Sequence, residues 1–280
     1  MTEKWLIAPG DARVIDIERA SKLKIGLVGG QVDVIAHDEP GIRVEVHGVT
    51  VKDLRIEHDG TQLEIDHPQL SWDNFLEVFR NFGSGGPQAE ISVAVPRDVA
   101  LTLGVVSASA LVSGLASDAK LNTVSGDIIV NTHRAGLSVN AVSGDVQVQD
   151  VDGSFSAHSV SGDVAVTGTP QAVDIDTVSG GMVIDATAPV DTISLNTVSG
   201  GATVRLPDDL AAKYAVRSMS GRLLIDGVDR GSSIPSSYSG QTGELAGTFV
   251  DVKFNSVSGD LTVLRHGPAA QGAHDEEWDA

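Results

Sequence analysis

The sequence predicts an all-β protein, a β-solenoid in the form of a single-stranded β-helix-like stack of coils of 18 to 21 residues, with an N-terminal β cap and one short helix. Three observations predict this class. The tripeptide Val-Ser-Gly recurs at a nearly fixed spacing, and apolar residues beside it alternate with a period of two. The 280 residues also include 31 glycines but only three Trp, two Tyr and six Phe, a composition typical of short strands between frequent turns.

The repeat defines the coil. Clear copies centre on Ser125, Ser143, Ser161, Ser179, Ser199 and Ser258, Met219-Ser220-Gly221 is a near copy, and the same template fits around Ser107. Counted from each serine, apolar residues fall at −6, −4, −1, +3 and +5. Each unit is therefore interpreted as strand, corner, strand and turn, with the apolar positions stacked inside coils about 4.8 Å apart. One hairpin per unit, giving an antiparallel β-sandwich or prism, is the alternative.

The end of the repeat is irregular. Ser220 and Ser258 are 38 residues apart, and the weak copy around Ser239 lacks apolar residues at −6 and −4. The Gly-Ser-Ser-Ile-Pro-Ser-Ser composition favours an excursion from the stack over residues 229–247, with a poorly formed coil as the alternative.

The expected organisation has three parts. Residues 1–95 form a β cap with a helical insert at 71–82, residues 96–265 form the repeat solenoid, and residues 266–280 form a disordered acidic tail. The cap is predicted from alternating segments between Ala20 and Pro68, each with one apolar and one charged face.

The insert carries the candidate partner-binding residues. A helix starting at Ser71 would place apolar side chains on one stripe. It could plug the open end of the solenoid, bind a protein groove or a neighbouring subunit, or, least favoured, contact a lipid surface. The candidates are Trp72, Phe75, Leu76, Phe79 and Phe82.

Charge and composition exclude several functions. Nineteen basic against 38 acidic residues give a net charge of −19, which disfavours nucleic-acid binding, and the absence of cysteine excludes disulfides and thiolate chemistry. No motif for a nucleotide or other cofactor occurs, so no cofactor is expected. The uncharged stretch 99–117 alternates as strands do, so no transmembrane segment is expected.

Three aspartates that follow Ser-Gly are weak cation candidates: Asp127, Asp145 and Asp163. They should stack about 5 Å apart. A role in the turn or in guarding the sheet edge is favoured, followed by cation binding, and the carboxylate pair of a retaining glycosidase is least favoured. The histidines at 37, 47, 58 and 67 are not expected to converge on a metal, and the repeated serine hydroxyls are expected to bond the backbone at the corner. No catalytic residue and no metal site is assigned.

The repeated V-S-G-D and V-S-G-G steps, after a strand-rich N-terminal segment, resemble the bacterial putative-adhesin family of β-strand-repeat proteins, over roughly Leu23 to Leu264. The function of that family is largely uncharacterised. The resemblance implies a β-solenoid-like fold and an adhesin-like role.

Together these patterns predict a non-enzymatic structural or interaction module that binds an unidentified protein or surface partner, or associates with itself. The alternatives are a carbohydrate-active enzyme on a β-helix scaffold and a scaffold that assembles end to end. Residues 1–10 lack a signal-peptide pattern and no anchor is seen, which favours the cytoplasm. Attachment to a membrane or envelope through a partner is the alternative.

Overall fold

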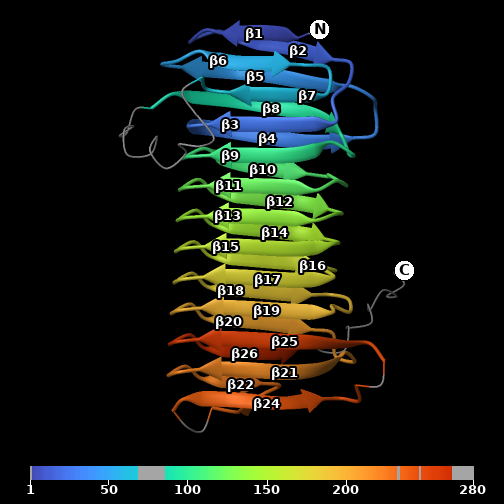
Figure 1. Ribbon diagram of the computed structural model, residues 1–280, viewed down its shortest axis with the longest axis vertical. Helices are drawn as coiled ribbons and strands as arrows, with labels where there is room; N and C mark the ends of the chain where they lie inside the picture. The colour runs from blue at the N-terminus through green and yellow to red at the C-terminus, as the bar shows by residue number, and fades with distance from the viewer. Residues whose placement is uncertain (1, 69–85, 232–233, 246, 267–280) are drawn as a thin grey trace, which may run out of the picture.

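The computed structural model describes residues 2–68, 86–231, 234–245 and 247–266. In them the chain winds into an elongated stack with two long sheets facing each other (Figure 1). Most coils contribute one strand to each sheet, and neighbouring coils pair in parallel, as Leu121 does with Val139 and Val130 with Val148. The β-solenoid is confirmed, and the antiparallel hairpin alternative is wrong for the repeat because hairpins would pair antiparallel.

Sheet A contains 13 strands, here in spatial order: β1 (Glu3–Ile7), β6 (Leu54–His58), β7 (Gln62–Asp66), β3 (Lys22–Leu27), β9 (Ala100–Val105), β11 (Ala119–Thr123), β13 (Leu137–Ala141), β15 (Ser154–Ser159), β17 (Ala172–Thr177), β19 (Thr192–Thr197), β25 (Phe249–Ser256), β21 (Ala211–Ser218) and β24 (Ser236–Thr242).

Sheet B also contains 13 strands: β2 (Arg13–Ile17), β5 (Ile42–Thr50), β8 (Gln88–Pro96), β4 (Gly29–His37), β10 (Ser109–Ser113), β12 (Ile128–His133), β14 (Val146–Val151), β16 (Val164–Gly168), β18 (Met182–Ala186), β20 (Ala202–Leu206), β26 (Leu261–Arg265), β22 (Leu223–Ile225) and β23 (Val228–Asp229).

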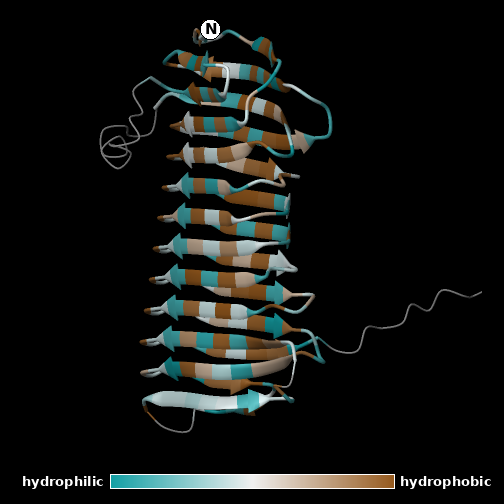
Figure 2. Ribbon diagram, turned by 45° about the vertical axis from the view of Figure 1, so that its right-hand side comes forward, coloured by the Kyte–Doolittle hydropathy of each residue, from teal (hydrophilic) through white to brown (hydrophobic). Residues whose placement is uncertain are grey.

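The interior is a continuous column of aliphatic side chains. Positions −6, −4, +3 and +5 are buried in successive coils, as Leu137, Val139, Val146 and Val148 are around Ser143. Figure 2 shows the resulting alternation of hydrophobic and hydrophilic residues along the strands. Burial of these ladders is the main favourable contribution to folding, at roughly 25 cal/mol per Å² of apolar surface.

The −1 position departs from the expectation. Val106 and Val124 are buried, but Val142 and the residues at −1 in the coils beyond it are exposed. The inward period of two that begins at −6 and −4 continues to −2, where a hydroxyl such as that of Thr123 is buried, so the −1 side chain points outward.

The N-terminal strands form the first end of the stack. β3 and β4 already make a complete coil, which pairs in parallel with β9 and β10. Beyond it, β7 pairs with β6 antiparallel and β8 with β5, and β1 and β2 lie at the edges. The stack is thus continuous from the cap into the repeat, and the boundary at residue 95 stays a prediction.

The C-terminal end is not in sequence order. The coil formed by β25 and β26 inserts between the β19–β20 coil and the β21–β22 coil. The stretch predicted as an excursion returns as β24, which pairs antiparallel with β21 at the edge of sheet A. It is therefore not a coil, and it covers the last coil instead of leaving the stack.

The described residues contain strands and no helix. The helix predicted for 71–82 falls within residues 69–85, outside the described part, as does most of the predicted tail at 266–280. Within the part that the structure describes, no helix has the length and hydrophobicity that a membrane crossing requires.

Candidate interaction surfaces

The V-S-G-D corner joins each sheet A strand to the sheet B strand that follows it. Its serine hydroxyl donates to a backbone carbonyl of the preceding coil, as Ser143 Oγ does to the oxygen of Val124 at 3.0 Å. The same bond recurs in Ser107, Ser125, Ser161, Ser179, Ser199, Ser220 and Ser258. The predicted role of these serines is confirmed: the hydroxyls tie one coil to the next.

A second hydroxyl closes most corners from inside, and sequence reasoning missed it. The Thr123 hydroxyl accepts the Gly126 N–H at 3.0 Å and donates to the Gly126 carbonyl at 2.7 Å. Ser159, Thr177, Thr197, Ser218 and Ser256 accept the equivalent glycine N–H. These side chains satisfy amides that would otherwise be buried without a partner. The recurrence of Thr or Ser at −2 was the available signal.

The corner glycine is required by the close approach of successive backbones. A Cβ on Gly162 would lie 2.0 Å from the carbonyl oxygen of Gly144, and one on Gly180 would lie 2.0 Å from that of Gly162. Any side chain there would force neighbouring coils apart.

The three weak cation candidates form a hydrogen-bonded ladder. Asp127 Oδ1 accepts the Asp145 N–H at 3.0 Å, Asp145 Oδ1 accepts the Asp163 N–H at 2.9 Å, and Asp163 Oδ1 accepts the Gly181 N–H at 2.7 Å. Each carboxylate thus satisfies a backbone donor in the next coil. No group of three or more His, Asp or Glu within the described residues could hold a metal ion.

The four N-terminal histidines have separate environments. His47 and His58 bond Ser92 and a backbone carbonyl, respectively, and His37 Nδ1 accepts a backbone N–H. His67 is fully buried, which lowers its pKa to about 4, and its Nδ1 is 3.5 Å from the amide nitrogen of Val28. These contacts explain the histidines without a shared ligand.

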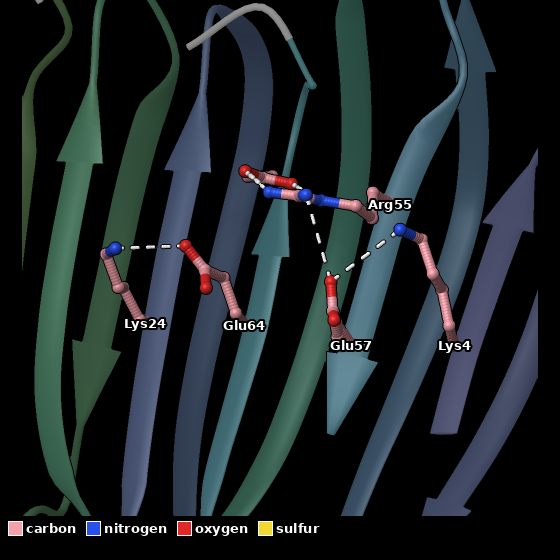
Figure 3. A network of polar contacts seen from close by, with 6 residues as sticks. Lys4, Lys24, Arg55, Glu57 and Glu64 are labelled. Atoms are coloured by element: carbon pink, nitrogen blue, oxygen red, sulfur yellow. Dashed lines mark hydrogen bonds and ion pairs between the residues drawn. The ribbon is translucent and has the colours of Figure 1, made fainter. Parts of the chain in front are cut away.

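Charged side chains fasten the cap to the first coil. Lys24 on β3 pairs with Glu64 on β7 at 2.9 Å, and Arg55 on β6 bonds the buried Asp66 at 2.7 Å. Figure 3 shows how Glu57 lies between Arg55 and Lys4, each at 3.8 Å. The network spans four neighbouring strands and therefore holds the end of sheet A together.

The described surface has shallow hollows. One, of about 550 Å³, lies beside Asp16, Arg43 and Glu39, where Asp16 is already paired with Arg43 at 2.7 Å. Another, of about 480 Å³, follows β9, β11, β13 and β15. Asp118 is its one acidic lining residue, and Asp118 Oδ1 accepts the Gly136 N–H at 3.1 Å. The first hollow is also lined by Glu18. The second has a single carboxylate and so lacks the facing pair that glycoside hydrolysis needs.

The exposed −1 residues form an extended apolar column on the described surface. We call it the corner ridge; it comprises, in spatial order, Val142, Val160, Val178, Val198, Val257 and Met219. These side chains are 38% to 57% exposed. Because they stand on six neighbouring coils, they form a straight line about 24 Å long.

The outer face of sheet A is different in character. Asn140 donates to Asn122 at 3.0 Å, Asn196 donates to Asp176 at 2.8 Å, and Asn255 donates to Asn196 at 2.9 Å. His158 lies 3.1 Å from Asp176 in the same line. This polar ladder stabilises the stack. The partner-binding candidates Trp72, Phe75, Leu76, Phe79 and Phe82 lie outside the described residues, so their role stays a prediction.

Comparison with known proteins identifies the architecture. The model of a family described as Toastrack DUF4097 matches residues 20–264. No curated protein matches the chain.

Solved structures resemble the chain at low sequence identity. One, titled a putative lipid binding protein from Parabacteroides distasonis, is 14% identical with a TM-score of 0.50, and the match covers 92% of this chain and 98% of that one. A putative cell adhesion protein from Clostridium sporogenes is 12% identical with a TM-score of 0.31, covering 92% and 100%. At these identities the likeness concerns the fold alone, and it is supported by the TM-score of 0.50 with the Parabacteroides distasonis protein.

Proposed function

We propose that this chain, which belongs to the Toastrack DUF4097 family, is a non-enzymatic, adhesin-like interaction module that binds a partner along the corner ridge. The protein from Parabacteroides distasonis that shares this fold is named as a putative lipid binding protein, which agrees with a binding role.

The corner ridge carries the proposal. Six exposed apolar side chains in register, such as Val178 and Val198, keep a continuous hydrophobic line in contact with water. Exposed apolar residues scattered singly need no explanation, whereas a contiguous set marks an interaction site. In the coils of these two valines, Asp gives way to Gly181 and Gly201, so the ridge is least charged there.

The non-enzymatic part is supported by what the corner side chains already do. The serine hydroxyls donate hydrogen bonds to backbone carbonyls, and the carboxylates of Asp127, Asp145 and Asp163 accept hydrogen bonds from backbone amides. A carbohydrate-active enzyme would need carboxylates converging across a groove. We therefore favour binding without turnover over that alternative.

The test compares the wild type with Val160→Ser/Val178→Ser/Val198→Ser as immobilised bait for bacterial lysate and envelope fractions. A matched control, Ser138→Ala/Ser156→Ala/Ser194→Ala, alters three side chains on the outer face of sheet A. We expect the ridge variant alone to lose bound partners, and the bound material to be recovered without a change in mass. Identical capture by all three proteins, or a ligand cleaved during capture, would contradict the proposal.

Three further expectations stay predictions. The aromatic segment could add a second contact, which Trp72→Ala/Phe75→Ala/Phe79→Ala tests in the same capture. End-to-end assembly would appear as a series of higher masses in sedimentation. The cytoplasmic location needs fractionation of cells that produce the chain.

A further inference from the structure

The outward side of sheet B differs from the rest of this acidic protein. We call it face B; it consists of the outward side chains of eight neighbouring strands, β4, β10, β12, β14, β16, β18, β20 and β26. Its first column contains Asp33, Leu111, Ile129, Gln147, Ala165, Val183, Thr203 and Thr262. The second contains Ile35, Ser113, Asn131, Gln149, Thr167, Asp185, Arg205 and Leu264.

Charge is nearly absent from these two columns. Of the sixteen positions only Asp33, Asp185 and Arg205 are charged, and Arg205 pairs with Asp185 at 3.5 Å. The whole chain carries −19. Face B is therefore a surface on which two copies could meet without the repulsion expected elsewhere.

The exposed apolar residues of face B are arranged symmetrically. The midpoint of face B lies between β14 and β16. In the first column, Ile129 is on β12 and Val183 is on β18, each on the second strand from this midpoint. Their side chains are 39% and 43% exposed. Ile35 on β4 and Leu264 on β26, 49% and 36% exposed, are in the second column, each four strands from the same midpoint. A surface with this symmetry is complementary to itself.

We propose that face B binds a second copy of this chain through a two-fold axis that lies in the interface, parallel to the strands, between β14 and β16. Rotation about this axis places each strand opposite the strand equally far on the other side. Ile129 then packs against the partner subunit's Val183, and Ile35 packs against the partner subunit's Leu264. Such an interface is isologous, the arrangement found in most homodimers.

The polar residues are compatible with the same axis. Asp33, Asp185 and Arg205 face the partner subunit's Thr262, Asn131 and Ser113, so no like charges meet within the two columns. At the rim, beside the corner, Asp145 faces the partner subunit's Asp163. This rim repulsion predicts a dimer that salt strengthens.

The size of face B fits a dimer. Eight five-residue strands, spaced about 4.8 Å apart with about 3.4 Å rise per residue, span roughly 600 Å² in projection. Side-chain relief brings the accessible area close to the roughly 800 Å² per partner of a standard interface. The outer face of sheet A is a poorer candidate because its β9 to β19 strands point no large aliphatic side chain outward.

The test uses the full chain and a charge swap across the axis. Ile129→Glu and Val183→Lys each place one charge opposite an apolar residue of the partner. The double variant Ile129→Glu/Val183→Lys places Glu opposite Lys twice. Within one chain the two positions are three strands, about 14 Å, apart, so rescue by the double variant reports contact between copies. Ser156→Lys, which adds the same charge on the outer face of sheet A, is the matched control.

Sedimentation equilibrium measures the outcome, with circular dichroism to confirm that each variant is folded. We expect a wild-type mass of twice 29.0 kDa. Each single variant should weaken association at least about tenfold, and the double variant should return to within about threefold of the wild type. The dissociation constant should fall as salt rises, and Ser156→Lys should match the wild type.

Three results would overturn the inference. The first is a wild-type protein that stays monomeric at about 100 µM, a concentration that reveals dissociation constants of that order. The second is a double variant that associates as weakly as the single variants. The third is equal weakening by Ser156→Lys. All of these variants leave the corner ridge unchanged, so a failure of this inference leaves the proposed ridge function intact.

Discussion

Asp145 Oδ1 accepts the backbone N–H of Asp163 on the next coil at 2.9 Å, so a side chain of one repeat completes the backbone of another. The same relation joins Asp260 to the Arg222 amide at 2.7 Å, between coils 38 residues apart in the sequence. The aspartates of V-S-G-D therefore connect coils by spatial order, whatever their order along the chain.

This relation predicts a stability cost for removing the carboxylate. Asp145→Ala should lower the free energy of unfolding by about 1 kcal/mol, the net value of a typical intramolecular hydrogen bond. Asp174→Ala, on the exposed outer face of sheet A, should change it by less than about 0.5 kcal/mol. Urea denaturation followed by circular dichroism measures both, and equal effects would contradict the ladder.

The ladder also predicts insensitivity to calcium. The carboxylates of Asp127, Asp145 and Asp163 already accept amide protons, so about 5 mM CaCl₂ should leave the melting temperature unchanged. Calorimetry with and without chelator measures this, and a clear rise with calcium would identify a cation site at the corner.

The corner glycines predict a steep difference between neighbours. Gly180→Ala would place a Cβ 2.0 Å from the Gly162 carbonyl oxygen, whereas Gly181→Ala would meet its nearest atom, a side-chain oxygen of Asp163, at 3.3 Å. We expect a loss of at least about 3 kcal/mol for the first and under about 1 kcal/mol for the second. Similar melting temperatures for the two variants would disprove the close approach of the coils.

His67 predicts a pH dependence. Burial lowers its pKa from 6.5 to about 4, so between these values the unfolded chain binds a proton that the folded chain does not. The free energy of unfolding is therefore unaffected by this histidine above pH 6.5. It decreases as the pH falls towards 4, by about 3 kcal/mol in total.

Stability measured from pH 7 to 4 in wild type, His67→Gln and His47→Gln tests this. His67→Gln should reduce the loss of stability between pH 7 and 4. His47→Gln, at an exposed histidine, should lose as much stability as the wild type. His133, whose pKa burial also lowers, contributes equally to all three proteins. A decline of the same slope in His67→Gln would refute the assignment.

Arg265 predicts local stability at the C-terminal end. Its guanidinium donates to Asp226 at 3.0 Å, to the Pro207 carbonyl at 3.0 Å and to the Tyr214 hydroxyl at 3.2 Å. Arg265→Ala should cost about 2 to 3 kcal/mol, because it leaves the half-buried Asp226 without its cation. Arg134→Ala, which breaks only exposed ion pairs, should cost less than about 1 kcal/mol.

Hydrogen exchange locates the effect of Arg265→Ala. Faster exchange should be confined to β21 through β26, the strands of the last two coils and the two edge strands that pair with them. Uniform acceleration along the whole stack would mean that the end does not open independently.

The sequence by itself determined the coil. Its 18-residue base period, the apolar ladders such as Leu137 and Val139, and the serine hydroxyl bonds all follow from local patterns that repeat unchanged. A repeat makes each coil its neighbour's environment, so local chemistry is sufficient. The repeat also predicts that the aspartates stack at the corner. It does not predict that each carboxylate accepts a hydrogen bond from a backbone amide of the next coil.

Only the tertiary structure decided whether the −1 side chains point into the core or into solvent, and in what order the last coils stack. The Val142 side chain at −1 is exposed and the Thr123 side chain at −2 is buried, because the inward-facing positions of the strand continue from −6 and −4 to −2. The apolar pattern did not show this. The β25–β26 coil has a complete apolar template, with Val252, Phe254, Leu261 and Val263 all buried, and can therefore be covered on both sides. The polar β24 cannot supply such a core, and it lies at the edge. This order of burial places Leu264 opposite Ile35 across the midpoint of face B, a relation between distant segments that no local pattern records.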